Sequence, residues 1–277
     1  MGARIGYPNE VVEGHVSYRV FGDHFDPAVG FVARNNFRRV HSRIAWSPRV
    51  PSVAWLRGVS FQVQRSSQET IDTGVLEDRE WQLKLLGLNF ESGDEIELNA
   101  NHRFEFLDAS FEVDDGVVVA PGEYSNWEYE ISAETSRRRR VSVEGSHAVS
   151  GFWDGDRSRS EAQITFRPNP GISLSTNVEY NHVEMPGGSF TASLYEASGD
   201  WNPSPWVSIT NRLQYDDQSE LLGLFARIRW IVKPGNDVYF VYSHNWQYVS
   251  LLASPNERTL TTLSRGASVK VNYTYRF

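Results

Sequence analysis

The chain has 277 residues and a net charge of −8, with 35 Asp and Glu against 27 Lys and Arg, which argues against nucleic acid as a partner. It has no cysteine, and this excludes disulfide scaffolds and thiolate metal sites. No apolar run approaches the roughly 18 residues of a membrane-spanning helix, so a helical membrane protein is excluded. A transmembrane β-barrel is not excluded, because half of each of its strands faces a polar lumen.

Apolar and polar residues alternate along most of the chain, which is the period of a strand with one apolar and one polar face. Residues 1–10 are interpreted as the remnant of a strand from the upstream part of a longer chain. No helical period of useful length follows, and most of the expected strands reach the roughly 9–11 residues that cross a bilayer. We expect about fourteen strands, at 12–21, 37–47, 53–66, 76–91, 95–107, 124–136, 141–153, 157–168, 172–184, 189–200, 206–216, 221–232, 237–249 and 260–277.

The connections between these strands fall into two classes. Compact segments rich in Pro and Gly follow every second strand, as at 233–237, whereas the other connections vary and include two long ones, 22–36 and 108–123. Tight turns on one rim and longer loops on the other are typical of outer-membrane barrels, whose short turns are periplasmic. The alternation also changes phase at Leu85 and Leu86, which predicts a β-bulge there.

The C-terminal segment alternates without a break, and its apolar face ends in Tyr273, Tyr275 and Phe277. By itself this pattern fits a half-exposed strand of a soluble sheet as well as a barrel strand. The segment resembles the last strand of bacterial outer-membrane barrels. This resemblance implies that Tyr273, Tyr275 and Phe277 form the signal that the barrel-assembly machinery reads.

Five stretches resemble one family of large bacterial outer-membrane proteins: 6–10, 25–34, 121–124, 214–216 and 227–242. In the second stretch Asp26 and Ala33 stand where the family pattern FNPxxGFVPR has Asn and Pro. Members pair an N-terminal domain similar to carbohydrate-binding module family 9 with a C-terminal barrel domain of unknown function, and nothing in this chain matches the binding module. The resemblance implies that residues 1–277 are a single outer-membrane barrel domain, or the C-terminal part of a larger barrel.

Charged residues on the polar faces separate along the chain. In a closed barrel the two sets would form opposite walls of the lumen, and charged rows in a pore act as a selectivity device. The alternative is that these residues simply make the lumen polar and pair across neighbouring strands. The acidic wall is Glu95, Glu97, Glu105, Glu128, Glu130, Glu134 and Glu179, and the basic wall is Arg39, Arg43, Arg212, Arg227, Arg229, Lys270 and Arg276.

Other candidate sites are weaker. No catalytic motif, cofactor fingerprint or metal-ligand spacing occurs, so we expect no catalytic residue, no cofactor and no metal. The run from Arg137 to Arg140 either binds anionic headgroups or polyanions or forms a solvated turn. The loop 108–123 and the strand after it are a candidate for saccharide stacking, through Phe111, Asp114, Asp115, Tyr124 and Trp127.

The sequence therefore predicts an all-β, antiparallel, up-and-down transmembrane β-barrel, integral to the bacterial outer membrane. The predicted function is a non-catalytic pore or surface scaffold linked to glycan binding or uptake. Its expected partners are the lipid bilayer and the barrel-assembly machinery, with a saccharide as candidate ligand and no nucleic acid. The alternative is a soluble carbohydrate-binding β protein or a glycoside-acting enzyme, which would fold without detergent.

Overall fold

The computed structural model describes residues 1–25, 35–251 and 254–275. These residues form a 15-stranded antiparallel sheet and a separate two-stranded hairpin. In the described part of the chain, no helix is long and apolar enough to cross a membrane.

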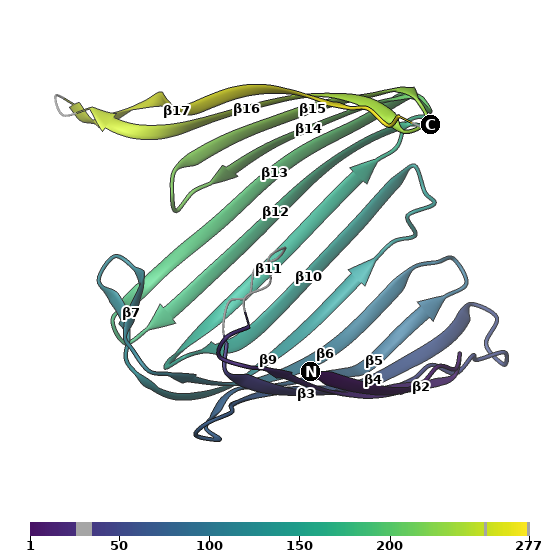
Figure 1. Ribbon diagram of the computed structural model, residues 1–277, viewed down its shortest axis with the longest axis vertical. Coiled ribbons are helices and arrows are strands. Elements are labelled where there is room, and N and C mark those ends of the chain that lie inside the picture. The colour runs from purple at the N-terminus through teal and green to yellow at the C-terminus, as the bar shows by residue number, and fades with distance from the viewer. Residues whose placement is uncertain (26–34, 252–253, 276–277) are drawn as a thin grey trace. The chain divides into compact units, whose positions relative to one another are not determined.

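The strands of the large sheet follow one another in chain order, so every neighbour in the sheet is also the neighbour along the chain, apart from the hairpin inserted between β6 and β9 (Figure 1). Antiparallel strands joined in this way form an up-and-down meander. The sheet contains β1 (Gly2–Tyr7), β2 (Val12–Phe21), β3 (Phe37–Trp46), β4 (Leu56–Thr70), β5 (Leu76–Phe90), β6 (Glu95–Leu107), β9 (Gly122–Glu134), β10 (Val141–Phe152), β11 (Gly155–Phe166), β12 (Ile172–Met185), β13 (Gly188–Ser204), β14 (Val207–Asp216), β15 (Leu221–Lys233), β16 (Asn236–Leu251) and β17 (Ser254–Asn272).

The predicted all-β, antiparallel, up-and-down fold is confirmed. The sheet has one strand more than expected, because part of the segment 1–10 forms β1 and pairs with β2 from Gly2 opposite Arg19 to Tyr7 opposite Gly14. The predicted bulge is confirmed as well, since the register between β5 and β6 shifts between Lys84 and Leu86. The extra residue at this bulge shifts the alternation by one position, so the apolar side chains on both sides of it stay on the same face of the sheet.

The described residues divide into two compact units: 1–134, 146–159 and 182–190 form the first, and 135–145, 160–181 and 191–277 form the second. The first unit holds β1 to β9 and the parts of β10 to β13 next to two tight connections, 153–154 and 186–187. The second holds the rest of β10 to β13 and β14 to β17. The single domain over 1–277 stays a prediction.

The segment 108–123 was predicted to be a loop, but it contains the hairpin of β7 (Phe111–Asp114) and β8 (Val117–Val119). Asp115 and Gly116 make its turn, with Gly116 at a φ of 77° in the left-handed region that favours glycine. The side chain of Glu112 accepts a hydrogen bond from the Gly116 backbone N–H at 2.7 Å. A tight turn between two short apolar runs therefore replaces the expected irregular loop.

This hairpin contributes to the buried apolar cluster of the first unit. Val117 and Val119 pack with Val183 and Met185, and Phe152 lies against the cluster. Outside this cluster, the described part of the main sheet buries four more apolar side chains: Phe37, Ala45, Ala100 and Ala148. Half of the buried apolar side chains of the described residues therefore lie where the hairpin meets the sheet, and the others are spread over β3, β6 and β10.

Val119→Ala is expected to loosen the hairpin. Val119 is 0% exposed, and each buried methylene contributes roughly 0.8 kcal/mol, so the change should cost about 2 kcal/mol of local stability. The matched control is Val118→Ala, because Val118 is 54% exposed and its loss should cost less than about 0.5 kcal/mol. Amide hydrogen exchange of 111–119 measures both changes, and equal exchange in the two variants would contradict this packing.

The C-terminal strand differs from the expected one at its end. β17 ends at Asn272, opposite Asp237 at the start of β16, and the ladder between the two strands stops at this pair. Thr274 instead donates its backbone N–H to the Asn236 side chain at 2.6 Å and its hydroxyl to the Gly235 carbonyl at 2.8 Å. These bonds hold the chain after β17 against the β15–β16 turn and the first residue of β16.

Candidate functional site

The exposure of the apolar and the charged face of the sheet is the reverse of that in a water-soluble protein. On β9, Trp127, Tyr129 and Ile131 are 43%, 54% and 51% exposed. The side chains of Glu128 and Glu130, which alternate with them, are only 19% and 20% exposed. The apolar face of this strand is therefore the more accessible one, and the charged face is the more enclosed.

The second unit repeats this arrangement on its last strands. Trp230 and Val232 of β15 are each 53% exposed. On the opposite face of the neighbouring strand, the carboxylate of Asp237 is 12% exposed and accepts a hydrogen bond from Arg229 at 2.8 Å. In both units, the apolar face of these strands is therefore the one that is accessible to the surroundings.

The acidic residues of β6 and β9 share one face. The register places Glu95 opposite Glu134, Asn99 opposite Glu130 and Asn101 opposite Glu128. Glu97 and Glu105 lie on the same face because their residue numbers differ from that of Glu95 by even amounts, and side chains of a strand alternate between its faces. Glu179 belongs to β12 in the second unit, where it accepts a hydrogen bond from Asn181 at 2.9 Å.

Several of these acids form ion pairs with bases on nearby strands. Lys84 on β5 contacts Glu97 on β6. Arg157 and Arg159 on β11 reach β9, where they lie 2.9 Å from Glu128 and 2.8 Å from Glu130. For these residues the structure shows acids that pair with bases on nearby strands.

The pairs between β11 and β9 span the intervening strand β10. The two-residue connection 153–154 places Ser150 beside Arg157 and Ala148 beside Arg159. Both side chains on β10 are small, and Ala148 is 2% exposed. The arginines therefore extend over β10 to carboxylates two strands away, an interaction that the sequence analysis missed.

The basic residues also have partners on nearby strands. Arg39 and Arg43 on β3 donate to Gln68 at 3.1 Å and Gln62 at 2.6 Å on β4. In the second unit, Arg212 pairs with Glu196 at 3.3 Å.

Three bases gather on the face that β15 to β17 share. Arg229 lies opposite Tyr239, which lies opposite Lys270, and Arg227 is two residues from Arg229. Arg276 lies outside the described residues. The opposition of an acidic and a basic wall across a lumen stays a prediction.

The predicted assembly signal lies only partly within the described residues, and its role stays a prediction. Tyr273 and Tyr275 are 68% and 70% exposed and follow the end of β17. Phe277 lies outside the described residues, as does 26–34, the larger part of the second family-like stretch.

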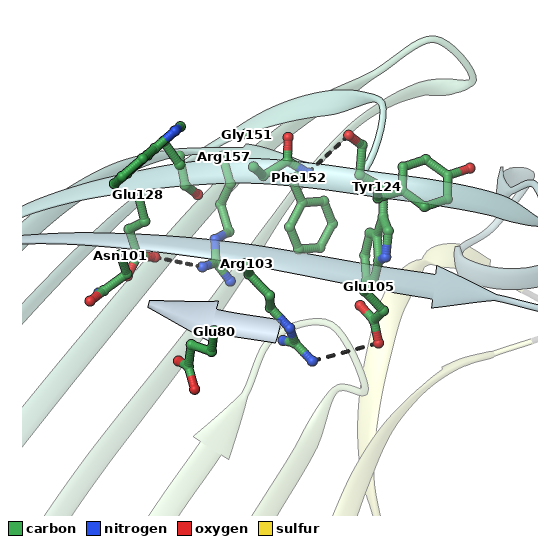
Figure 2. Close-up of a pocket in the computed structure, with 13 residues that line it drawn as sticks. Glu80, Asn101, Arg103, Glu105, Tyr124, Glu128, Gly151, Phe152 and Arg157 are labelled. Carbon is green, nitrogen blue, oxygen red and sulfur yellow. Dashed lines mark hydrogen bonds and ion pairs between the residues drawn. The ribbon is translucent and has the colours of Figure 1, made fainter. Parts of the chain in front are cut away.

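A cavity of about 230 Å³ lies on the charged face of the first unit (Figure 2). Glu128 at its wall is held by Arg157 and by Asn101, whose amide donates at 3.2 Å. Arg103 pairs with Glu105 at 3.5 Å. The lining comes from β5, β6, β9, β10, β11 and the β10–β11 turn: Glu80, Asn101, Arg103, Glu105, Tyr124, Asn126, Trp127, Glu128, Ser150, Gly151, Phe152, Trp153 and Arg157.

Aromatic rings form one side of this cavity. Trp153 packs edge-on against Phe152 and Phe111, with ring centroids 4.3 and 5.1 Å apart. It has a φ of 51°, a conformation that costs free energy for a bulky residue and that the surrounding packing must offset. Its backbone carbonyl accepts a hydrogen bond from Asn126 at 3.0 Å. The turn thus fixes the rings beside the charged groups.

The residues predicted to stack on a saccharide separate into two groups. Tyr124 lines the cavity from the charged face, whereas Trp127 belongs to its lining although its ring stacks on Tyr129 on the apolar face. Phe111 lies against Trp153, and Asp114 belongs to the hairpin with Asp115 in its turn. Among the described residues, no three His, Cys, Asp or Glu side chains come together to hold a metal ion.

Most of the cavity lining was missed, including Glu80, Arg103, Phe152 and Arg157. The alternation of Arg157 and Arg159 after the turn at 153–154 was the one available signal, since it places both bases on the polar face of β11. The strand pairings that bring them to β9 do not appear in the sequence pattern.

No protein-family model and no curated protein sequence matches the chain. Among solved structures, it is similar to the FrpB iron transporter of Neisseria meningitidis (F3-3 variant), with a TM-score of 0.49 and 9% identity over 99% of this chain and 57% of that chain. A triple mutant of Rhodopseudomonas blastica porin gives a TM-score of 0.32 and 10% identity over 97% of this chain and 99% of the porin. The chain spans little more than half of the transporter's length.

Proposed function

We propose that this chain is an integral outer-membrane β-barrel protein, or the C-terminal part of one, that forms a pore or surface scaffold linked to glycan binding or uptake. Its apolar face contacts lipid, and its charged face lines a water-filled passage. The barrel-assembly machinery inserts it, and it carries out no catalysis. The charged rows on the polar face set the ion preference of the passage.

The observation that carries this proposal is the exposed apolar face of the strands. Trp127, Tyr129 and Ile131 in the first unit and Trp230 and Val232 in the second are about half exposed. Continuous apolar surface of this kind is rare on a soluble monomer, whereas a membrane strand places one face in lipid. Lipid contact supplies the burial that the small apolar cluster of the first unit does not.

The soluble alternative meets a physical difficulty. A soluble β protein would bury these aromatic side chains between two layers and expose the carboxylates. Here the carboxylates of Glu128 and Glu130 are enclosed by arginines, and the aromatic side chains beside them are accessible. Burying the charged face instead of the apolar face would cost free energy in water.

The cavity supports the proposed glycan link. Its rings can stack on the apolar faces of a sugar, and its arginines, carboxylates and amides can hydrogen-bond to hydroxyl groups. Arg103 is the most adaptable of these groups, because its side chain is 62% exposed and its ion pairs are long, at 3.5 and 3.7 Å. A neutral oligosaccharide is the ligand class that this mixture fits.

The test is carried out on the chain refolded into detergent. A closed barrel resists SDS until it is boiled, so the unboiled band should migrate anomalously, and reconstitution into planar bilayers should give conductance steps. A neutral oligosaccharide should block them reversibly. Arg103→Gln should weaken this block roughly tenfold. The control Arg19→Gln, which removes the same charge from β2 outside the cavity lining, should leave it unchanged.

Each part of the proposal fails on a different result. A monodisperse, folded protein in plain buffer would rule out the membrane function. A heat-modifiable protein without conductance would rule out the pore and leave the scaffold. If the saccharide blocks both arginine variants equally, it does not bind in this cavity.

A further inference from the structure

Two turns of the second unit and one residue of a neighbouring strand line a separate, open cavity of about 430 Å³. The turns are the connections after β9 and after β11, and the strand residue is Asn202 near the end of β13. Backbone hydrogen bonds tie them together: the N–H of Arg167 donates to the Arg140 carbonyl at 2.6 Å, and that of Asn202 to the Gly171 carbonyl at 2.7 Å. The two turns and the end of β13 are therefore joined into one frame.

The charge of this frame has one sign. Among the described residues, four arginines and no carboxylate line the cavity: its lining is Arg138, Arg139, Arg140, Arg167, Pro168, Asn169, Pro170, Gly171, Ile172, Ser173 and Asn202. The nearby carboxylate of Glu144 pairs with Arg137, which does not line the cavity, at 3.5 Å. Arg167 is held in place by donating to the Ser142 hydroxyl at 2.9 Å. Guanidinium groups gathered in this way match the oxygens of a phosphate group.

Exposed apolar side chains border the arginines along the chain. Phe166 precedes Arg167 and is 43% exposed, Val141 follows Arg140 and is 49% exposed, and Trp201 precedes Asn202 and is 51% exposed. Aromatic side chains of membrane strands lie at the level of the lipid headgroups. In the proposed membrane protein, the arginine cavity would therefore lie at the depth where phosphate groups of lipids are found.

We propose that this cavity binds phosphate groups, presented by an anionic lipid headgroup or by a soluble phosphate. The lipid source rests on the proposed membrane function, whereas the soluble source does not. The arginines act through paired N–H donors on phosphate oxygens, so geometry as well as charge determines the affinity. Short turns of outer-membrane barrels face the periplasm, which assigns the lipid to the inner leaflet.

The test compares two triple variants of the full chain. R138Q/R140Q/R167Q removes the charge, and R138K/R140K/R167K keeps the charge but removes the planar fork of donors. Native mass spectrometry of the detergent-folded protein measures binding of phosphatidylglycerol against phosphatidylcholine, and titration calorimetry measures inorganic phosphate. Circular dichroism and the unboiled gel band establish that each variant folds.

The glutamine variant should lose roughly a hundredfold in affinity for phosphatidylglycerol, since each arginine contributes about 1 kcal/mol, or roughly a factor of five. The lysine variant should lose at least about tenfold if the fork geometry matters. R137Q, outside the cavity, should lose no more than about fivefold. A lysine variant that binds like the unchanged protein would mean non-specific attraction and would overturn the proposal.

The two sources separate by competition. Displacement of phosphatidylglycerol by millimolar inorganic phosphate assigns the site to phosphate groups in general, and binding without displacement assigns it to the lipid. If the chain proves water-soluble, the membrane function fails, but phosphate binding that is lost in R138Q/R140Q/R167Q would still support the cavity. Absence of binding to both probes would overturn it.

Discussion

Ile131→Arg is expected to lower the free energy of unfolding in phospholipid vesicles by about 2–4 kcal/mol, a factor of roughly 30 to 1,000 in the folding equilibrium. Ile131 is 51% exposed on the apolar face of β9 and lies opposite Leu98 of β6, which is 38% exposed. In the proposed barrel both side chains face lipid, so a charge placed there loses its hydration without gaining a partner. Denaturant titration of the vesicle-bound protein measures the loss.

The control is one residue further along the strand. Ser132 lies on the charged face, opposite Glu97, so Ser132→Arg adds the same side chain among carboxylates and should change stability by less than about 0.5 kcal/mol. If the protein is soluble, the two variants should be about equally stable, because an exposed Ile in water tolerates replacement by Arg. Equal stability of the two variants, with both folded in plain buffer, would therefore end the membrane proposal.

The sequence pattern predicted most of the sheet because one physical feature determines it. Alternation places each residue on a face, and Pro and Gly mark the turns, so the bounds of β2 and β6 agree with the expected 12–21 and 95–107. The hairpin of β7 and β8 was missed although Asp115 and Gly116 form a common hairpin turn, because the flanking runs are too short to show a period.

The candidate site was less predictable for a different reason. Alternation assigns Glu128 and Arg157 to polar faces, but it does not give the relative register of three strands. The pair forms only because β10 brings a small side chain between them, and this depends on a turn of two residues at 153–154. The phosphate site likewise depends on backbone bonds between turns that are far apart in the sequence.

A second large effect on stability is expected when a small side chain of β10 is enlarged. Ala148→Leu places a larger group beneath the contact between Arg159 and Glu130, where Ala148 is 2% exposed. Overfilling a closely packed site costs about 1–3 kcal/mol, and the arginine must also lift away from its carboxylate. The unfolding free energy of the refolded protein should fall by this amount.

Val149→Leu is the matched control, because Val149 is 49% exposed on the opposite face and its enlargement should cost less than about 0.5 kcal/mol. A double-mutant cycle between Glu130 and Arg159 then locates the cause. The coupling should be roughly 0.5–3 kcal/mol in the unchanged background and close to zero with Leu at position 148. If Ala148→Leu costs stability while the coupling survives, the arginine does not extend over Ala148, and the route of the ion pair from β11 to β9 has to be sought beside Ser150 instead.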